Sequence, residues 1–157
     1  MNFIKKPTHS LSKSSIYLTI AFFTLILIAC GQKTQSVDKG KERLDKVCDT
    51  FMELFTENKT KAALRLIKQN TVISHSTIDT LQLTIDSQMN NLTRVYGKML
   101  SYEFITEKKI KDFYAKRFYV VKFDVYYLKF DFTLYKSTNG WTITNFKYNE
   151  ELNELLN

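Results

Sequence analysis

The chain has 157 residues and a formal net charge of +7, and 44% of its residues are hydrophobic. This length and composition predict one globular domain with a core of its own. The basic residues are spread along the chain and their excess is modest, which argues against a nucleic-acid-binding protein. With two cysteines and two histidines in the chain, the sequence offers little material for a disulfide framework or a Cys/His metal site.

The N-terminal segment combines basic residues with a short apolar run. Lys5, Lys6 and Lys13 precede the run Ile16–Cys30, and the first acidic residue is Asp38. This order is typical of a secretory signal peptide. The run has fourteen residues before its cysteine, which is short of the roughly 20 that a membrane-spanning helix needs. We therefore expect export rather than a membrane-spanning segment.

The end of this run resembles the lipobox of bacterial lipoproteins. Leu27-Ile28-Ala29-Cys30 is followed by Gly31, so the thiol stands between two small residues. The resemblance implies that Cys30 becomes the acylated N-terminus, carrying palmitate-type chains that attach the protein to a membrane of the bacterial cell envelope, inner or outer. The alternative is an ordinary cleaved signal, or an uncleaved anchor, in which Cys30 has no special role.

Three parts of the chain follow from this interpretation. Residues 1–29 are the expected signal peptide, residues 30–40 the lipidated cysteine with a polar, flexible linker, and residues 41–157 the folded domain. If Cys30 is lipidated, Cys48 has no disulfide partner within the chain, and His75 is the only histidine after the signal. No Gly-rich phosphate loop or metal-ligand spacing is present, so we predict neither a cofactor nor a metal.

Helical periodicity dominates the first half of the domain. Apolar residues recur at three- and four-residue steps in Lys41–Asn58, Lys61–Lys68 and Thr77–Tyr96. Cys48 lies on the apolar stripe of the first segment, which predicts a small buried hydrophobe. Ser76 or Thr77 is the expected start of the third helix, and Gly97 its C-terminal stop.

After Gly97 the apolar period changes to two residues, which predicts antiparallel strands. The expected strands are Met99–Thr106, Phe118–Tyr127, Phe130–Tyr135 and Trp141–Tyr148. The charged segment Glu107–Arg117 is expected to be an exposed connection, and Asn139-Gly140 indicates a hairpin turn. A phase slip between Tyr127 and Phe130 predicts a turn or bulge there, and the spacing from Ile143 to Phe146 predicts another bulge.

The strand region also holds most of the aromatic residues. Residues 99–148 contain 15 of the chain's 22 aromatic side chains, so we expect the sheet to form one wall of the core. The predicted architecture is α+β, with three N-terminal helices packed on a curved antiparallel sheet of about four strands. Alternation places Phe104, Phe123 and Phe132 on the inner face, and the acids Glu103, Asp124 and Asp131 on the opposite one.

This order of elements resembles the NTF2-like, cystatin-like superfamily, and within it small bacterial lipoproteins of uncharacterised families. The shared segments are Tyr96-Gly97-Lys98-Met99-Leu100-Ser101, where the first strand begins, and Gly140-Trp141-Thr142-Ile143 in the last strand. The resemblance covers about residues 41–148 and implies a cone in which the sheet wraps a long helix. The sequence departs from the superfamily in having only Thr71–Ile73 where a strand often follows the second helix.

Enzymes of this superfamily hold a carboxylate or histidine base inside the cone. Here the strand acids are expected to point away from the interior, so no catalytic residue is predicted. The leading interpretation is a lipid-anchored, non-enzymatic module that binds a ligand or a protein. The aromatic residues expected to contact a ligand are Tyr102, Phe104, Tyr119, Phe123, Tyr127, Phe132 and Trp141. The alternative is that these side chains only pack in the hydrophobic core.

Two further functions remain as alternatives. One is an isomerase- or dehydratase-like enzyme acting on a small hydrophobic compound in the cone, which a pocket containing Asp124, Asp131 or His75 would favour. The other is a homodimeric scaffold that associates through the outer face of the sheet, where Val120, Tyr126 and Tyr135 are expected to form an exposed patch. The expected partners are thus the membrane, through the anchor, and a protein or a second copy of the chain.

Overall fold

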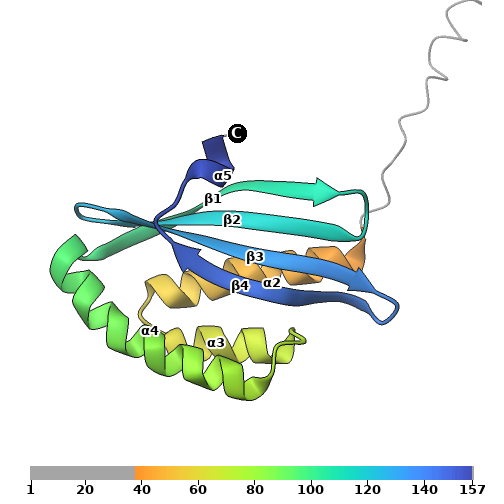
Figure 1. Ribbon diagram of the computed structural model, residues 1–157, viewed down its shortest axis with the longest axis horizontal. Helices are drawn as coiled ribbons and strands as arrows, with labels where there is room; N and C mark the ends of the chain where they lie inside the picture. The colour runs from red at the N-terminus through yellow and green to blue at the C-terminus, as the bar shows by residue number, and fades with distance from the viewer. Residues whose placement is uncertain (1–37, 157) are drawn as a thin grey trace, which may run out of the picture. The chain divides into compact units, whose positions relative to one another are not determined.

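The computed structural model describes residues 38–156. Cys30, the expected signal peptide and most of the expected linker lie outside the described residues. Helices come first and strands second, as Figure 1 shows, and the elements are α2 (Lys39–Thr56), α3 (Thr60–Gln69), α4 (His75–Tyr96), β1 (Met99–Ile110), β2 (Tyr114–Phe123), β3 (Tyr127–Ser137), β4 (Gly140–Asn149) and α5 (Asn153–Leu156). The predicted α+β architecture is confirmed. Within the described region, no helix has both the length and the hydrophobicity that crossing a bilayer requires.

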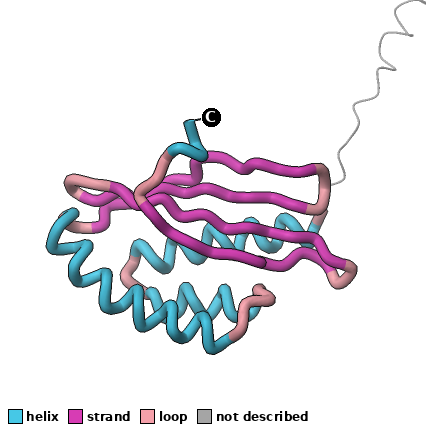
Figure 2. The backbone as a smooth tube through the Cα atoms, viewed as in Figure 1, coloured by secondary structure: helices cyan, strands magenta, loops and turns pink. Residues whose placement is uncertain are grey.

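The strands form one antiparallel meander in the order β1-β2-β3-β4, and the sheet does not close (Figure 2). Tyr119 of β2 lies opposite Phe104 of β1 and Phe130 of β3, so these three side chains share the inner face. The pairing of β3 with β4 shifts between Thr133 and Leu134, which confirms the bulge predicted in the last strand. Aromatic rings of neighbouring strands therefore meet on one side of the sheet.

Two strand boundaries differ from the prediction. The charged segment expected to be a connection belongs to the sheet, because β1 continues to Ile110 and β2 already begins at Tyr114. The next turn lies before Tyr127 rather than after it, and the Phe123 amide closes it by donating to the Tyr126 carbonyl at 2.8 Å. β2 and β3 then pair without a register shift. The phase slip in the sequence marks this turn, and Tyr127 consequently lies opposite Lys122 on the outer face.

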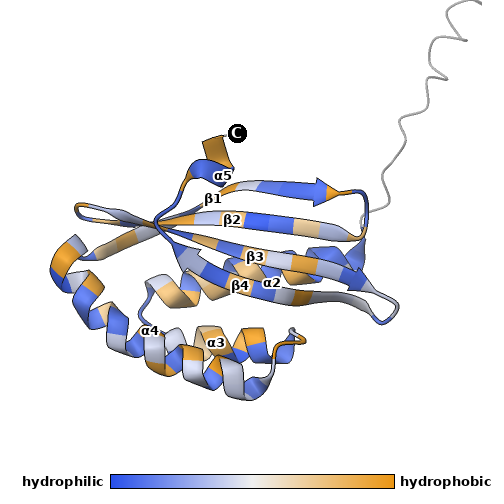
Figure 3. Cartoon of the chain, viewed as in Figure 1, coloured by the Kyte–Doolittle hydropathy of each residue, from blue (hydrophilic) through white to orange (hydrophobic). Residues whose placement is uncertain are grey.

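Helix α2 packs on the inner face of the sheet because its apolar stripe matches the rings there. Phe51 lies within 4.8–5.3 Å, centroid to centroid, of Phe146 and Phe132, and Phe55 lies 4.9 Å from Phe130. Cys48 on the same stripe is fully buried, as predicted, and burial raises the pKa of its thiol. Figure 3 shows the resulting alternation of polar and apolar residues along the strands and around the helices.

The start of α2 is tied to the far edge of the sheet. Asp38 caps the helix, accepting hydrogen bonds from the amides of Gly40 at 3.0 Å and Lys41 at 3.3 Å. Its second carboxylate oxygen accepts from Trp141 Nε1 at 2.9 Å and pairs with Lys136 Nζ at 2.7 Å. The hydrogen bonds from Lys136 and Trp141 hold the pKa of Asp38 well below its usual range. One side chain thus joins α2 to β3 and β4.

Helices α3 and α4 extend the helical layer away from the sheet (Figure 1). Helix α4 begins at His75, one or two residues earlier than expected, because Ser74 caps it by accepting a hydrogen bond from the Thr77 amide at 3.2 Å. Between the two helices, Thr71 forms an isolated parallel bridge with Ile143 of β4. The stretch expected to replace the superfamily's extra strand is therefore reduced to one bridge.

A glycine makes the passage from α4 into β1 possible. Gly97 has a φ of 84°, a backbone conformation that side chains with a Cβ rarely adopt. A Cβ at this position would lie 2.6 Å from Asp124 Cβ. Asp124 in turn accepts a hydrogen bond from the Lys98 amide at 2.7 Å. The predicted helix stop is confirmed, and the same carboxylate fixes the β2–β3 turn against the start of β1.

The outer face of the sheet carries a buried carboxylate. Asp131 is fully buried without a hydrogen-bond partner among the described residues, and the nearest cations are Lys116 Nζ at 3.6 Å and Lys147 Nζ at 3.8 Å. Burial raises its pKa. Glu154 of α5 pairs with Lys116 at 2.6 Å and so holds the C-terminal segment against this face.

The three residues expected to form an outer patch lie apart from one another. Val120 lies opposite Lys129 in the middle of the sheet, whereas Tyr135 lies opposite Tyr114 near one end of β3. Tyr126 lies beyond the other end of β3, in the turn, where its ring packs on Tyr96 at 4.6 Å. The patch proposed from strand alternation is therefore not one continuous surface.

Candidate functional site

An open cleft of about 560 Å³ lies between the C-terminal half of α4 and the end of β4. The burial of α4 decreases along its length, although its last residue accepts a hydrogen bond from the Val125 amide of the β2–β3 turn at 3.1 Å. The fully buried residues of α4, Ile78 and Ile85, both lie in its first half, whereas Leu92 and Tyr96 in its second half are only half-buried. The side chains along the lining come from α4, from the start of β3 and from the end of β4 with the two residues after it.

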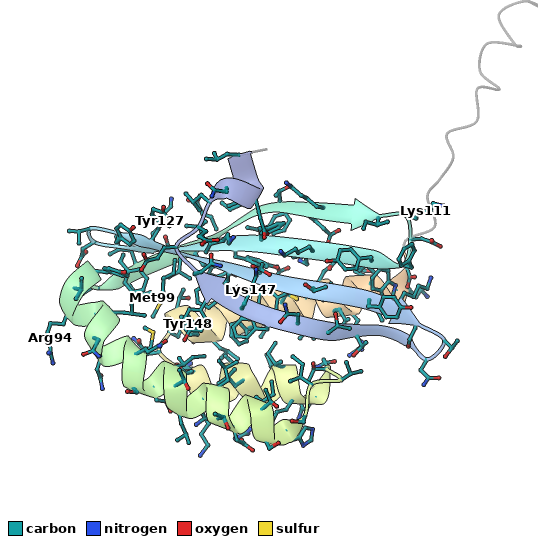
Figure 4. All side chains as sticks on the ribbon, viewed as in Figure 1. Arg94, Met99, Lys111, Tyr127, Lys147 and Tyr148 are labelled. Carbon is teal, nitrogen blue, oxygen red and sulfur yellow. The ribbon has the colours of Figure 1, made fainter. Side chains whose placement is uncertain are left out.

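The floor of the cleft is apolar. Leu92 and Val95 contribute from α4, Leu128 from β3, and the ring of Tyr148 from β4. Val95 is 66% exposed, so apolar surface of the lining is open to solvent. Figure 4 shows Tyr148 between β4 and α4. An apolar floor of this kind removes hydrocarbon from water and is the usual base of a small-molecule site.

The rim is polar and is held by tyrosine hydroxyls. Tyr148 donates to Gln88 Oε1 at 2.5 Å, which spans the gap from β4 to α4. Tyr96 donates to Glu150 Oε1, and Tyr127 donates to the Glu150 carbonyl at 3.2 Å. The hydrogen bond to Glu150 raises the pKa of Tyr96 to about 12, and burial raises the pKa of Tyr148. Both tyrosines therefore stay protonated near neutral pH and position the rim.

None of the seven aromatic residues predicted to contact a ligand is among the described residues that line this cleft. Tyr119, Phe123 and Phe132 are buried in the core. Tyr102 is half-buried beside Tyr119, and Trp141 is half-buried with its ring nitrogen on Asp38. Phe104 is exposed at the β1 edge. Tyr127 lies on the outer face and reaches only the backbone of the rim.

No sequence pattern distinguishes the residues that line the cleft from residues of the core. Leu92 and Tyr96 continue the apolar stripe of α4, so periodicity assigns them to the core. Tyr148 lies near the end of the last strand, and strand alternation does not distinguish a cleft residue there from a core residue. Leu92 and Tyr96 differ from Ile85 in burial, because Ile85 is buried whereas they are half-buried, and burial depends on long-range packing.

A second group that the sequence did not reveal lies inside the fold, between α2 and strands β1 and β2. Arg117 Nη1 pairs with Asp45 at 3.1 Å and with Glu107 at 3.3 Å, and its Nη2 pairs with Asp49 at 3.0 Å. Lys41 Nζ lies 2.5 Å from both Asp45 and Glu107. The expectation that the inner face carries no acid is therefore wrong. It failed because Glu107 and Arg117 were placed in a loop.

This ion network is partly buried, because the Arg117 and Glu107 side chains are 10% and 11% exposed whereas those of Asp45 and Asp49 are 25% and 46% exposed. Tyr119 donates to Asp49 Oδ1 at 2.5 Å and accepts from Arg117 Nε at 2.9 Å. Burial and the hydrogen bond to Asp49 raise the pKa of Tyr119. Burial works against ionisation of Glu107, but the hydrogen bonds from Lys41 and Lys109 outweigh it and lower the pKa. Ionised carboxylates fastened by cations in this way join the helix to the sheet.

A smaller hollow of about 380 Å³ lies at the start of α3. Its side chains are mostly charged or polar, with Lys59, Lys61 and Arg65 facing Asp86 of α4. It has no apolar floor comparable with that of the cleft, so the cleft is the stronger candidate for binding an organic ligand. His75, considered above as a catalytic residue, lines neither cavity.

Comparisons of the chain with known protein families, with curated proteins and with solved structures give no match.

Proposed function

We propose that this protein is a lipid-anchored component of the bacterial cell envelope whose NTF2-like domain binds a small amphiphilic ligand without transforming it. The anchor rests on the sequence Leu27-Ile28-Ala29-Cys30, and the superfamily on the order of three helices and four antiparallel strands. The binding function rests on the cleft, whose volume of about 560 Å³ and apolar floor suit such a ligand.

The chemistry of the rim favours binding over turnover. An enzyme of the isomerase or dehydratase type needs a base that reaches the bound substrate. The ionisable residues among the described lining are Tyr96, Tyr148, Glu150 and Glu151. Tyr96 and Tyr148 carry raised pKa values, and the Glu150 carboxylate already accepts a hydrogen bond from Tyr96. The two tyrosines are therefore better suited to orienting a ligand than to taking a proton from it.

The anchor is tested by replacing the lipobox cysteine. In the native host, Cys30→Ser is expected to abolish incorporation of labelled fatty acid and to leave uncleaved precursor. Cys48→Ser is the matched control, because Cys48 is buried in the core and should not affect labelling. A Cys30→Ser protein that is still cleaved, membrane-bound and labelled would refute the lipoprotein assignment.

The cleft is tested by filling it. Val95→Trp is expected to weaken binding of the uncharged probe N-phenyl-1-naphthylamine at least about tenfold, because the indole would occupy the apolar floor. The measurement is probe fluorescence on the lipidated protein in nanodiscs, with protein-free nanodiscs subtracted.

Leu83→Trp is the matched control for this experiment. Leu83 lies on the same helix and is 72% exposed, close to the 66% of Val95, but it does not line the cleft. Equal loss of binding in both variants would point to a general effect on α4. Unchanged binding in Val95→Trp would remove the cleft as the binding site.

A further inference from the structure

We infer that the cleft selects ligands that carry a protonated amine on an apolar body, and that Glu150 together with the tyrosine rings of the cleft binds the ammonium group. This inference deepens the proposed function and rests on it, since it concerns the same cleft. It follows from the charge of the rim, the placement of the rings and the direction of the neighbouring cations.

The rim carries negative charge without compensation inside the cleft. Glu150 and Glu151 both line it, and none of the described lining residues is a lysine, arginine or histidine. Tyr96 occupies Oε1 of Glu150, and no hydrogen bond or ion pair among residues 38–156 reaches the other oxygen. The Glu151 amide donates to Asn149 Oδ1 at 3.1 Å, which fixes the turn that presents both glutamates. One carboxylate oxygen therefore remains for a ligand.

Tyrosine side chains lie next to Glu150. The Tyr96 ring, whose hydroxyl holds Glu150, packs against Tyr126 at 4.6 Å. Tyr126 stacks on Tyr127 at 4.9 Å with 11° between the ring planes, and Tyr127 donates to the backbone of Glu150. Tyr148 supplies a further ring in the lining. Tyr96 and Tyr148 thus bring ring surface into the same cleft as the Glu150 carboxylate, and both the anion and the ring quadrupoles would attract an ammonium group there.

Three cations are adjacent in sequence to lining residues, and each is directed elsewhere. Lys129, next to Leu128, is buried with its Nζ 5.9 Å from the ring centroid of Phe118 on the outer face. Lys147 lies on the other face of β4, with Nζ 3.8 Å from Asp131 and 3.9 Å from Glu154. Arg94 projects from α4 away from the sheet (Figure 4). A carboxylate or phosphate headgroup at the rim would therefore face Glu150 without a counter-ion from the lining, while the apolar floor would hold its chain equally well. The cleft is therefore expected to discriminate between ligands by the charge of the headgroup rather than by the shape of the apolar chain.

The experiment compares three ligands of one chain length, octylammonium, 1-octanol and octanoate, by calorimetry at pH 7. The lipidated full chain is held in phosphatidylcholine nanodiscs, and protein-free nanodiscs supply the blank. We expect octylammonium to bind about tenfold tighter than 1-octanol, and octanoate to bind more weakly than either. The preference should shrink as salt is added, because the rim is open to solvent.

Glu150→Gln tests the residue itself. The amide oxygen still accepts the Tyr96 hydroxyl, so the rim keeps its shape while its charge is removed, and the preference for octylammonium over 1-octanol should fall to less than about threefold. Glu57→Gln, at the end of α2 and outside the cleft, is the control and should retain the preference.

The outcomes separate this inference from the proposed function. If 1-octanol binds and octanoate binds as tightly as octylammonium, the ammonium selectivity is wrong and the cleft remains a binding site. A preference that survives Glu150→Gln likewise overturns the role of Glu150. If none of the three ligands binds, both the selectivity and the proposed function fail.

Discussion

Replacing Arg117 by methionine is expected to lower the free energy of unfolding by about 3–5 kcal/mol, the range found when one partner of a buried ion pair is removed. The guanidinium pairs with Asp45, Asp49 and Glu107 at 3.0–3.3 Å. Its side chain and that of Glu107 are only 10% and 11% exposed, so the loss comes mainly from this pair, since Asp45 and Asp49 are 25% and 46% exposed. Methionine fills much of the same volume but leaves these carboxylates with fewer partners. Urea unfolding followed by circular dichroism measures the change.

Lys122→Met on the same strand is the matched control. Lys122 also pairs with a glutamate, Glu103, but the two side chains are 48% and 54% exposed. An ion pair in that environment contributes between zero and about 1 kcal/mol, so the variant should unfold close to the wild type. If Arg117→Met were no more destabilising than Lys122→Met, the partly buried network would not be what joins α2 to the sheet.

The ion network around Arg117 could not be predicted from local sequence patterns. Asp45 and Asp49 are spaced one helical turn apart, next to the apolar stripe of α2, and Arg117 and Tyr119 alternate on one strand, so a signal was present. It was overridden because the run of lysines from Lys108 to Lys111 reads as a solvated connection. The strand instead continues through Glu107, since Lys41 and Arg117 compensate its charge from the inner side. Pairing across elements is not visible in local periodicity.

The fold itself was accessible because its signals are local. The change of apolar period at Gly97, the Asn139-Gly140 turn and the aromatic alternation of β2 and β3 each constrain one element, and together they define an α+β meander. The β2–β3 turn was misplaced because residues 124–126 carry none of the glycine or proline that usually marks a turn. Asp124 provides the constraint instead, through its contact with the Lys98 amide.

The burial of Asp131 on the outer face could not be predicted from the sequence either. The alternation of the strand correctly places Asp131 on the face opposite Phe130 and Phe132. A carboxylate on an outer sheet face is ordinarily exposed to solvent. The short helix α5 changes the environment of Asp131, because Glu154 of this helix pairs with Lys116 on the outer face of the sheet. A tail of a few residues with weak amphipathic character gives no indication of where it docks, so neither the burial of Asp131 nor its raised pKa follows from the sequence.

Phe51→Ala is expected to destabilise the domain by about 3–5 kcal/mol, which is typical when a buried phenylalanine is truncated to leave a cavity. Phe51 is fully buried, and its ring contacts Phe55 of α2 together with Phe132 and Phe146 of the sheet. These neighbours are held by two different layers, so they can collapse only partly into the space. Urea unfolding should show a lower midpoint with an unchanged denaturant dependence, because the surface exposed on unfolding stays nearly the same.

The matched control is Phe113→Ala in the β1–β2 turn. Phe113 is 40% exposed, and the one ring contact found for it among the described residues is with Tyr135 at 6.4 Å. Truncation there removes little packing and should cost less than about 1 kcal/mol. The contrast isolates the packing of α2 against the sheet, since both variants lose the same phenyl ring. If the two variants unfolded at the same urea concentration, the aromatic layer around Phe51 would not be the main source of stability, and the sheet would have to hold its shape without the helix.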